Sequence, residues 1–132
     1  MYKGIPQNDV GIRTDILDGV PKAIGMEMIV RSMAPEIIVA DEIGNIEDVK
    51  AINYATSCGV KGIFTAHGDE IHDLYSNIYL EKLINLNIFE RIFFLDKTKK
   101  GKLKYIYYLD KTEKDSSKKY KQWICIYIDK II

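Results

Sequence analysis

The chain has 132 residues, 47% of them hydrophobic and 29% charged, and its 19 basic residues equal its 19 acidic residues in number. This composition is typical of one globular domain with a single apolar core. No apolar run approaches the roughly 18 to 20 residues of a membrane span, and the N-terminus lacks the apolar stretch of a secretory signal, so we expect a cytosolic protein.

The charged residues are unevenly distributed along the chain. Residues 1–96 contain 8 basic and 15 acidic residues, whereas residues 97–132 contain 11 and 4. A basic segment is typical of a nucleic-acid or membrane surface, but these lysines form no motif, and we favour a solvated loop. The two cysteines, Cys58 and Cys125, form no C-x-x-C pair, so buried free thiols are expected and not a disulfide framework or zinc ribbon.

The first third of the chain predicts a loop, a helix and a strand. Residues 1–20 show no sustained hydrophobic period and are expected to form a loop. Apolar residues at helical spacing predict a helix over residues 21–32. The short, β-branched run 37–40 then predicts a buried parallel strand that ends at Asp41 and Glu42.

The middle of the chain continues the alternation of helices and strands. Asn45 is a predicted N-cap, with Asp48 three residues later as in a capping box, and Gly59 is the predicted stop of this second helix. Further elements are expected at residues 62–66 (strand), 71–75 and 79–86 (helices), and 92–95 (strand).

The lysine-rich tail contains two β-rich runs, 103–109 and 123–128, which predict an antiparallel hairpin with a long loop. The whole order indicates an α/β fold with a mainly parallel sheet and right-handed crossovers. We expect a single domain over residues 1–132, in which the loop at 1–20 and the tail at 97–132 flank an α/β core at 21–96.

Polar residues gather where two predicted parallel strands end, which is where such sheets place their chemistry. Four apolar residues followed by Asp41 and Glu42 match the Walker B pattern of nucleoside triphosphatases. In that pattern the aspartate reaches Mg²⁺ through water and the glutamate polarises the attacking water. His67, after the next strand, suits a role near the γ-phosphate. A buried strand that merely ends in acidic loop residues is the common alternative.

Two histidines and two acidic residues also raise the question of a metal site: His67, Asp69, Glu70 and His72. The histidines are five residues apart, whereas ligands on one helical face need a spacing of three or four, and Gly68 interrupts the backbone. We therefore give the metal site less weight and interpret His72 as a partly exposed helix residue.

No glycine opens a G-x-x-x-x-G-K-[ST] motif, the loop whose N–H groups and lysine hold phosphates. Tight triphosphate binding by this chain alone is therefore not expected. Arg13 and Arg31 are candidates for contacting phosphate or a neighbouring subunit at the same edge. Surface solvation or a local ion pair is the alternative for each.

Six segments together closely resemble the stage III sporulation protein AA family: GIPQND, RTDILD, PKA, RSMAPE, DEIG and TAHG. The resemblance covers about residues 4–95, in order, and the tail matches only loosely. That family is similar to the secretion ATPases of type II and type IV systems. The resemblance implies part of a RecA-like P-loop ATPase core, the C-terminal portion of an ATPase domain, with the P-loop upstream of the segment where this chain begins.

The resemblance also implies roles for individual residues. Asp41 takes the Mg²⁺ position, through water, and Glu42 the catalytic Walker B position. His67 takes the position of the secretion-ATPase histidine, and Arg31 that of the arginine ahead of the Walker B strand. Arg13 lies in a loop near the nucleotide edge. ATP and Mg²⁺ are then cofactors of the full-length protein only, and this chain alone is expected to be inactive.

The same resemblance implies the setting of the protein. It implies a homo-oligomeric ring, expected to be a hexamer, that is cytoplasmic and peripheral to the membrane in the mother cell during sporulation. Its partners are the membrane channel proteins that link mother cell and forespore, and no specific nucleic acid is expected. Two departures alter the local charge: Asn45 replaces an expected arginine, and Asp69 and Glu70 add acids beside the phosphate.

A rival interpretation is a non-catalytic module that docks on a ring or membrane complex through the basic hairpin. Five aromatic residues would supply its contact area: Tyr105, Tyr107, Tyr108, Trp123 and Tyr127. Nucleic-acid binding by the same surface is a third and weaker interpretation, which predicts a steep loss of affinity with salt.

Overall fold

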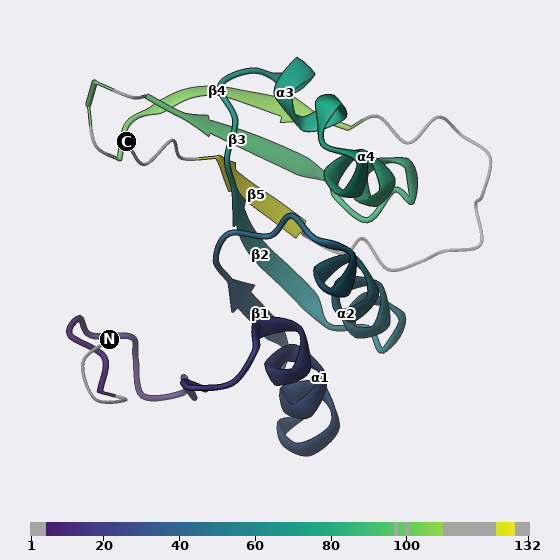
Figure 1. Cartoon of the computed structure of the whole chain (residues 1–132). Coiled ribbons are helices and arrows are strands. Elements are labelled where there is room, and N and C mark those ends of the chain that lie inside the picture. Colours follow the sequence, from purple (N-terminus) through teal and green to yellow (C-terminus); the bar gives the residue numbers. More distant parts are fainter. Residues whose placement is uncertain (1–4, 97, 100, 110–123, 129–132) are drawn as a thin grey trace.

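The computed structural model describes residues 5–96, 98–99, 101–109 and 124–128 of the chain. Helices and strands alternate as far as β2, after which two helices precede β3 and two more strands follow (Figure 1). In chain order the elements are α1 (Lys22–Met33), β1 (Ile37–Ala40), α2 (Ile46–Ser57), β2 (Lys61–Ala66), α3 (Ile71–Ser76), α4 (Ile78–Asn85), β3 (Arg91–Leu95), β4 (Leu103–Tyr108) and β5 (Ile124–Ile128).

The strands form one five-stranded sheet in the order β1-β2-β5-β3-β4. β5 lies between β2 and β3 and is parallel to both, while β4 is antiparallel to β3. The predicted hairpin between residues 103–109 and 123–128 is therefore wrong, because its two strands pair with other partners (Figure 1). The β5 sequence ICIYI is hydrophobic or aromatic at every position, as is common in strands of parallel sheets.

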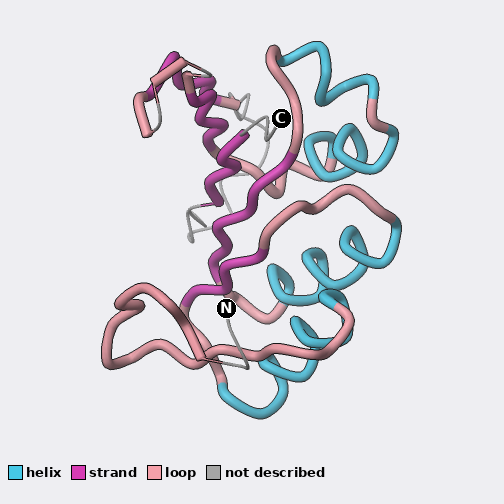
Figure 2. Tube along the Cα trace, turned by 60° about the vertical axis from the view of Figure 1, so that its left-hand side comes forward, coloured by secondary structure: helices cyan, strands magenta, loops and turns pink. Residues whose placement is uncertain are grey.

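The helices that the structure describes lie on one side of the sheet (Figure 2). Side chains therefore alternate along the strands between a covered and an open face. In β1, Ile38 and Ala40 point into the core and are buried, whereas Ile37 and Val39 are 52% and 71% exposed. Among the described residues the sheet thus has an apolar face that no helix covers.

The core fills the space between this sheet and the helices. Phe64 of β2 and Phe89, just before β3, meet edge to face with ring centroids 6.4 Å apart, and both are buried. Phe94 of β3 stacks on Tyr105 of β4 at 4.4 Å. The first contact joins β2 to the segment that leads into β3, and the second joins β3 to β4.

The predicted N-cap of α2 is confirmed. Asn45 Oδ1 accepts the N–H of Asp48 at 2.8 Å, and Asp48 Oδ2 accepts the N–H of Asn45 at 3.4 Å, which together form a capping box. This cap fixes the start of α2 directly after the turn that leaves β1.

Candidate functional site

The candidate site lies at the carboxyl ends of β1 and β2, which are parallel neighbours in the register Ala40 opposite Phe64. Thr65 ties the two strand ends together. Its Oγ1 accepts the N–H of Glu42 at 2.8 Å and donates to Asp41 Oδ1. Its carbonyl accepts the N–H of Ile43 at 2.9 Å. The acidic turn is therefore attached to β2 by both main-chain and side-chain hydrogen bonds.

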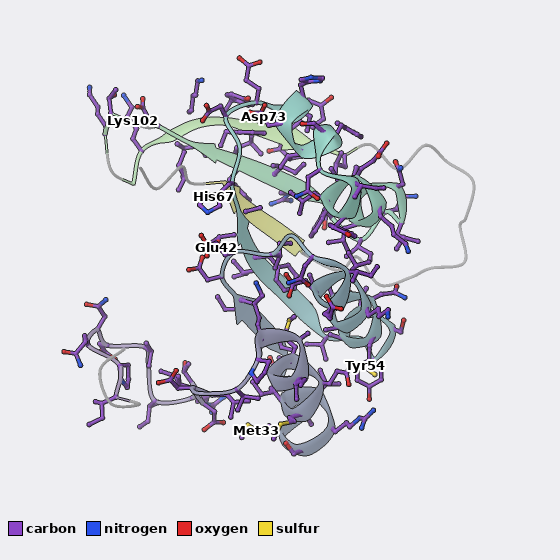
Figure 3. The ribbon with its side chains drawn as sticks, viewed as in Figure 1. Met33, Glu42, Tyr54, His67, Asp73 and Lys102 are labelled. Carbon is purple, nitrogen blue, oxygen red and sulfur yellow. The ribbon has the colours of Figure 1, made fainter. Side chains whose placement is uncertain are left out.

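Glu42 and His67 meet at this edge, one from each strand (Figure 3). His67 Nε2 lies 2.5 Å from Glu42 Oε1, and both side chains are about half exposed, at 49% and 61%. A carboxylate only accepts hydrogen bonds, so Nε2 carries the proton in this contact. The pair is thus open to solvent and to a ligand at the edge of the sheet.

Asp41 fits a magnesium position. Its side chain is exposed, one carboxylate oxygen accepts the Thr65 hydroxyl, and the other accepts no hydrogen bond among the described residues. Mg²⁺ is typically bound by one or two carboxylates, with water and substrate phosphates completing its shell. The oxygen donors of Asp41 and Thr65 match that chemistry.

Lys22 and Asp48 join the site, although the sequence indicated neither as a functional residue. The Lys22 ammonium donates to the main-chain carbonyls of Asp41, at 2.9 Å, and of Glu42, and lies 3.2 Å from Asp48 Oδ2. Asp48 is 1% exposed. The only sequence signals were the capping position of Asp48 and the place of Lys22 in the PKA segment of the family resemblance.

The structure does not bring Arg31 to the acidic turn. Its guanidinium lies 5.6 Å from the ring centroid of Tyr54, and a hydrogen bond to that residue raises the pKa of Arg31. Tyr54 lies at the far end of the helix layer from Glu42 (Figure 3). The reason is that α1 begins at the carboxyl edge with Lys22 and runs away from it, so its last turn lies at the opposite edge.

Arg13 lies in the exposed N-terminal loop. Among the described residues it makes no hydrogen bond or ion pair with the acidic turn. None of the described contacts therefore brings Arg13 to the edge of the sheet where the nucleotide was expected.

The acidic residues after His67 cap α3. Asp73 Oδ2 accepts the N–H groups of Asp69, at 2.7 Å, and Glu70, at 3.0 Å, and these bonds lower the pKa of Asp73. His72 is an exposed residue of α3. In the described part of the chain, no group of three or more His, Cys, Asp or Glu residues is placed to hold a metal ion.

Of the aromatic surface expected of the hairpin, the structure describes the three tyrosines on β4. Tyr107 and Tyr108 of β4 are exposed, at 42% and 63%, whereas Tyr105 packs on Phe94. Trp123 and the side chain of Tyr127 lie outside what the structure describes. In the same described part, no helix has the length and apolar character needed to cross a bilayer.

Comparison with known proteins gives a family match along most of the chain. The model of the family described as "Sporulation stage III, protein AA" matches residues 1–114. The chain is 43% identical over 97 residues to stage III sporulation protein AA of Bacillus subtilis (strain 168), a match that covers 74% of this chain and 32% of that protein. The chain thus spans about a third of the length of this relative. No solved structure matches it.

Proposed function

The chain belongs to the stage III sporulation protein AA family, and on that premise we propose that it carries the acidic and histidine part of an ATP-hydrolysing site. The observation that carries the proposal is the contact of Glu42 with His67 across neighbouring strand ends, beside an exposed Asp41. Phosphoryl transfer to water uses a carboxylate that helps to hold Mg²⁺ and a residue that orients the attacking water, and Asp41 and Glu42 offer these two groups side by side.

Each residue has a role that follows from its position. The Glu42 carboxylate accepts a proton from, and orients, the attacking water, because it is exposed and is an acceptor only. His67 holds that carboxylate through Nε2 and is the donor nearest to it. Asp41, fixed by the Thr65 hydroxyl, would hold Mg²⁺ through water. When bound, Mg²⁺ neutralises charge on the phosphates.

The phosphate-binding loop has to come from further polypeptide, because the 132 residues contain no such motif. We therefore place this chain in a larger RecA-like P-loop core and expect no ATP turnover from the chain alone. The resemblance to secretion ATPases supports extending the proposal to a hexameric ring, peripheral to the mother-cell membrane, that acts on the channel to the forespore.

A chimera tests the proposal, with this chain replacing the matched 97-residue segment of the Bacillus subtilis relative. Phosphate release is measured with ATP and Mg²⁺. Glu42→Gln is expected to lower kcat by roughly 10² to 10⁴-fold, the range of general-base contributions. The matched control is Glu47→Gln, which neutralises an exposed acid on α2 and should leave kcat unchanged.

Two results would overturn the proposal. The first is a chimera whose turnover is the same with Glu42→Gln as without it, which would remove Glu42 from the reaction. The second is Mg²⁺-dependent ATP turnover by the isolated chain that disappears in its own Glu42→Gln variant. That result would show that no further phosphate-binding polypeptide is needed.

The open face of the sheet favours a second candidate function, a non-catalytic module that docks on a ring or membrane complex. Ile37 and Val39 expose apolar side chains there, and exposed apolar patches of this kind are typical of interaction sites. Complementation of sporulation separates the two candidates. Docking alone predicts that Val39→Asp abolishes complementation while Glu42→Gln supports it fully, and the catalytic proposal predicts that Glu42→Gln abolishes it.

A further inference from the structure

Lys22 stands at the start of α1, where a positive charge is electrostatically disfavoured. The helix macrodipole places partial positive charge at the N-terminus, so acidic residues are favoured in the first turn. α1 has none there, its first residue is Lys22, and the preceding Pro21 provides no side-chain cap. A lysine at this position therefore needs acceptors from outside its own helix.

Three acceptors surround the Lys22 ammonium. They are the main-chain oxygens of Asp41 and Glu42 and the Oδ2 atom of Asp48. Two of its N–H groups donate to the two carbonyls of the acidic turn, and its charge pairs with the Asp48 carboxylate of α2. Asp48 Oδ2 is itself oriented by the N–H groups of Gly44, at 3.0 Å, and Asn45. Lys22 thereby joins α1, the turn after β1 and the first turn of α2.

The turn that Lys22 holds has a backbone conformation that L-residues rarely adopt. Glu42 has a φ of 52°, in the left-handed region, which persists only where the surroundings impose it. The N–H groups of Glu42 and Ile43 are bound from β2 by Thr65. The carbonyls of Asp41 and Glu42 are bound from α1 by Lys22. The two peptide groups that flank Glu42 are thus each held.

We propose that Lys22 is a positioning residue: with Asp48 orienting its ammonium, it keeps the Asp41–Glu42 turn in the left-handed conformation that directs the Glu42 carboxylate to His67. The value of this positioning for ATP hydrolysis rests on the function proposed above. The inference that Lys22 holds the turn does not rest on that function, because it follows from the contacts of Lys22 alone.

NMR spectroscopy of the isotopically labelled 132-residue chain tests the proposal through two signals. One is the strong intraresidue HN–Hα cross-peak of a positive φ at Glu42, and the other is the cross-peak between Glu42 and the His67 ring. Lys22→Met keeps the side-chain length and removes the donors. It removes two charge-assisted hydrogen bonds to the turn and is expected to lower the ratio of held to released turn by at least about tenfold, the effect of losing one of them. Lys50→Met, which removes an exposed lysine of α2, should change neither signal.

A folded Lys22→Met chain that keeps both signals at full strength would overturn the proposal. If Lys22→Met does not fold, Asp48→Asn decides, because it removes the charge that orients the ammonium and retains an oxygen acceptor for the cap. If the Glu42 signals are weaker in that variant and the NMR signals of Leu74 and Ile92 are unchanged, the positioning role is supported. Unchanged Glu42 signals, or equal changes at these two core residues, contradict it.

The same variants separate this inference from the proposed function. In an active chimera, Lys22→Met is expected to lower kcat more than it raises KM, because Glu42 acts on the attacking water while the Asp41 side chain keeps its hydrogen bond to Thr65. The result that would refute the proposed function is a chimera whose turnover Glu42→Gln leaves unchanged. The NMR signals would then still decide whether Lys22 holds the turn.

Discussion

Asp48→Ala is the substitution whose cost the structure predicts in most detail. Asp48 is buried, and a single oxygen, Oδ2, accepts hydrogen bonds from two backbone N–H groups and forms an ion pair with the Lys22 ammonium. Its other oxygen, Oδ1, has no partner among the described residues, so removing that atom sacrifices no hydrogen bond. All of the expected loss therefore comes from Oδ2.

The magnitude has two parts. Loss of the capping interaction at the start of α2 costs about 1 kcal/mol. Loss of the ion pair with Lys22 costs about 1 to 2 kcal/mol, less than a fully buried pair would, because the Lys22 side chain is 30% exposed and keeps two carbonyl acceptors. The free energy of unfolding should fall by about 2 to 3 kcal/mol, which corresponds to a Tm lower by roughly 10 °C for a domain of this size.

Urea unfolding followed by far-UV circular dichroism measures this loss. The matched control is Glu47→Ala, which removes the adjacent acid from the same first turn of α2 but from an exposed position. It should cost about 0.3 to 1 kcal/mol, the range of a helix-dipole interaction alone. If Asp48→Ala and Glu47→Ala differ by less than about 0.5 kcal/mol, the hydrogen bonds to Oδ2 do not contribute as reasoned.

Three further predictions concern packing and pH. Gly62→Ala should destabilise the fold by about 1 to 3 kcal/mol in urea unfolding, because an added Cβ would overlap the buried ring of Phe64; equal stability would refute that packing. Burial first, and nearby carboxylates second, raise the pKa of Tyr105. The resulting stabilisation is complete below about pH 10 and is lost as the pH rises through the raised pKa, so Tyr105→Phe should flatten the alkaline decline in stability. Two backbone N–H groups lower the pKa of Asp73. That stabilisation is present above about pH 4 and is lost as the pH falls through the lowered pKa. The Asp73→Asn variant should therefore be less stable than the wild type at neutral pH and should lose less stability as the pH falls. An equal loss of stability at low pH in both proteins would contradict this reasoning.

The local elements of the fold could be predicted because their signals are local. The capping box of Asn45 and Asp48 lies within four residues and was confirmed. The strands β1 and β2 follow from short apolar runs that end in polar residues. Their parallel pairing follows from the helix between them, and that pairing is what places Glu42 beside His67.

Pairing between distant segments could not be predicted. Residues 103–108 and 124–128 are successive β-rich runs, and successive strands pair more often than not, which led to the expected hairpin. Nothing in either run specifies that β5 should instead insert between β2 and β3. That choice depends on which edges of the sheet remain open after the other strands have paired.

Arg31 was expected at the site edge because the direction in which α1 runs was not taken into account. A helix that leads into a parallel strand begins at the edge where the strands end, so its first turn lies at the site and its last turn lies far away. Applied to the order of the elements, this rule places Lys22 at the site and Arg31 away from it. Arg31 was chosen because arginine commonly binds phosphate, whereas the fold places Lys22 at the carboxyl edge of the sheet.

The central place of β5 has a kinetic consequence. Two parts of the sheet, β1-β2 and β3-β4, each form from segments near in sequence, but each meets the other only through a strand synthesised later. Until β5 emerges from the ribosome, β2 and β3 each present an unpaired inner edge, and such edges invite non-native pairing. Closing the sheet then requires contacts between residues far apart along the chain, which slows folding. Among the described strands, the one that joins the two parts of the sheet is therefore made last.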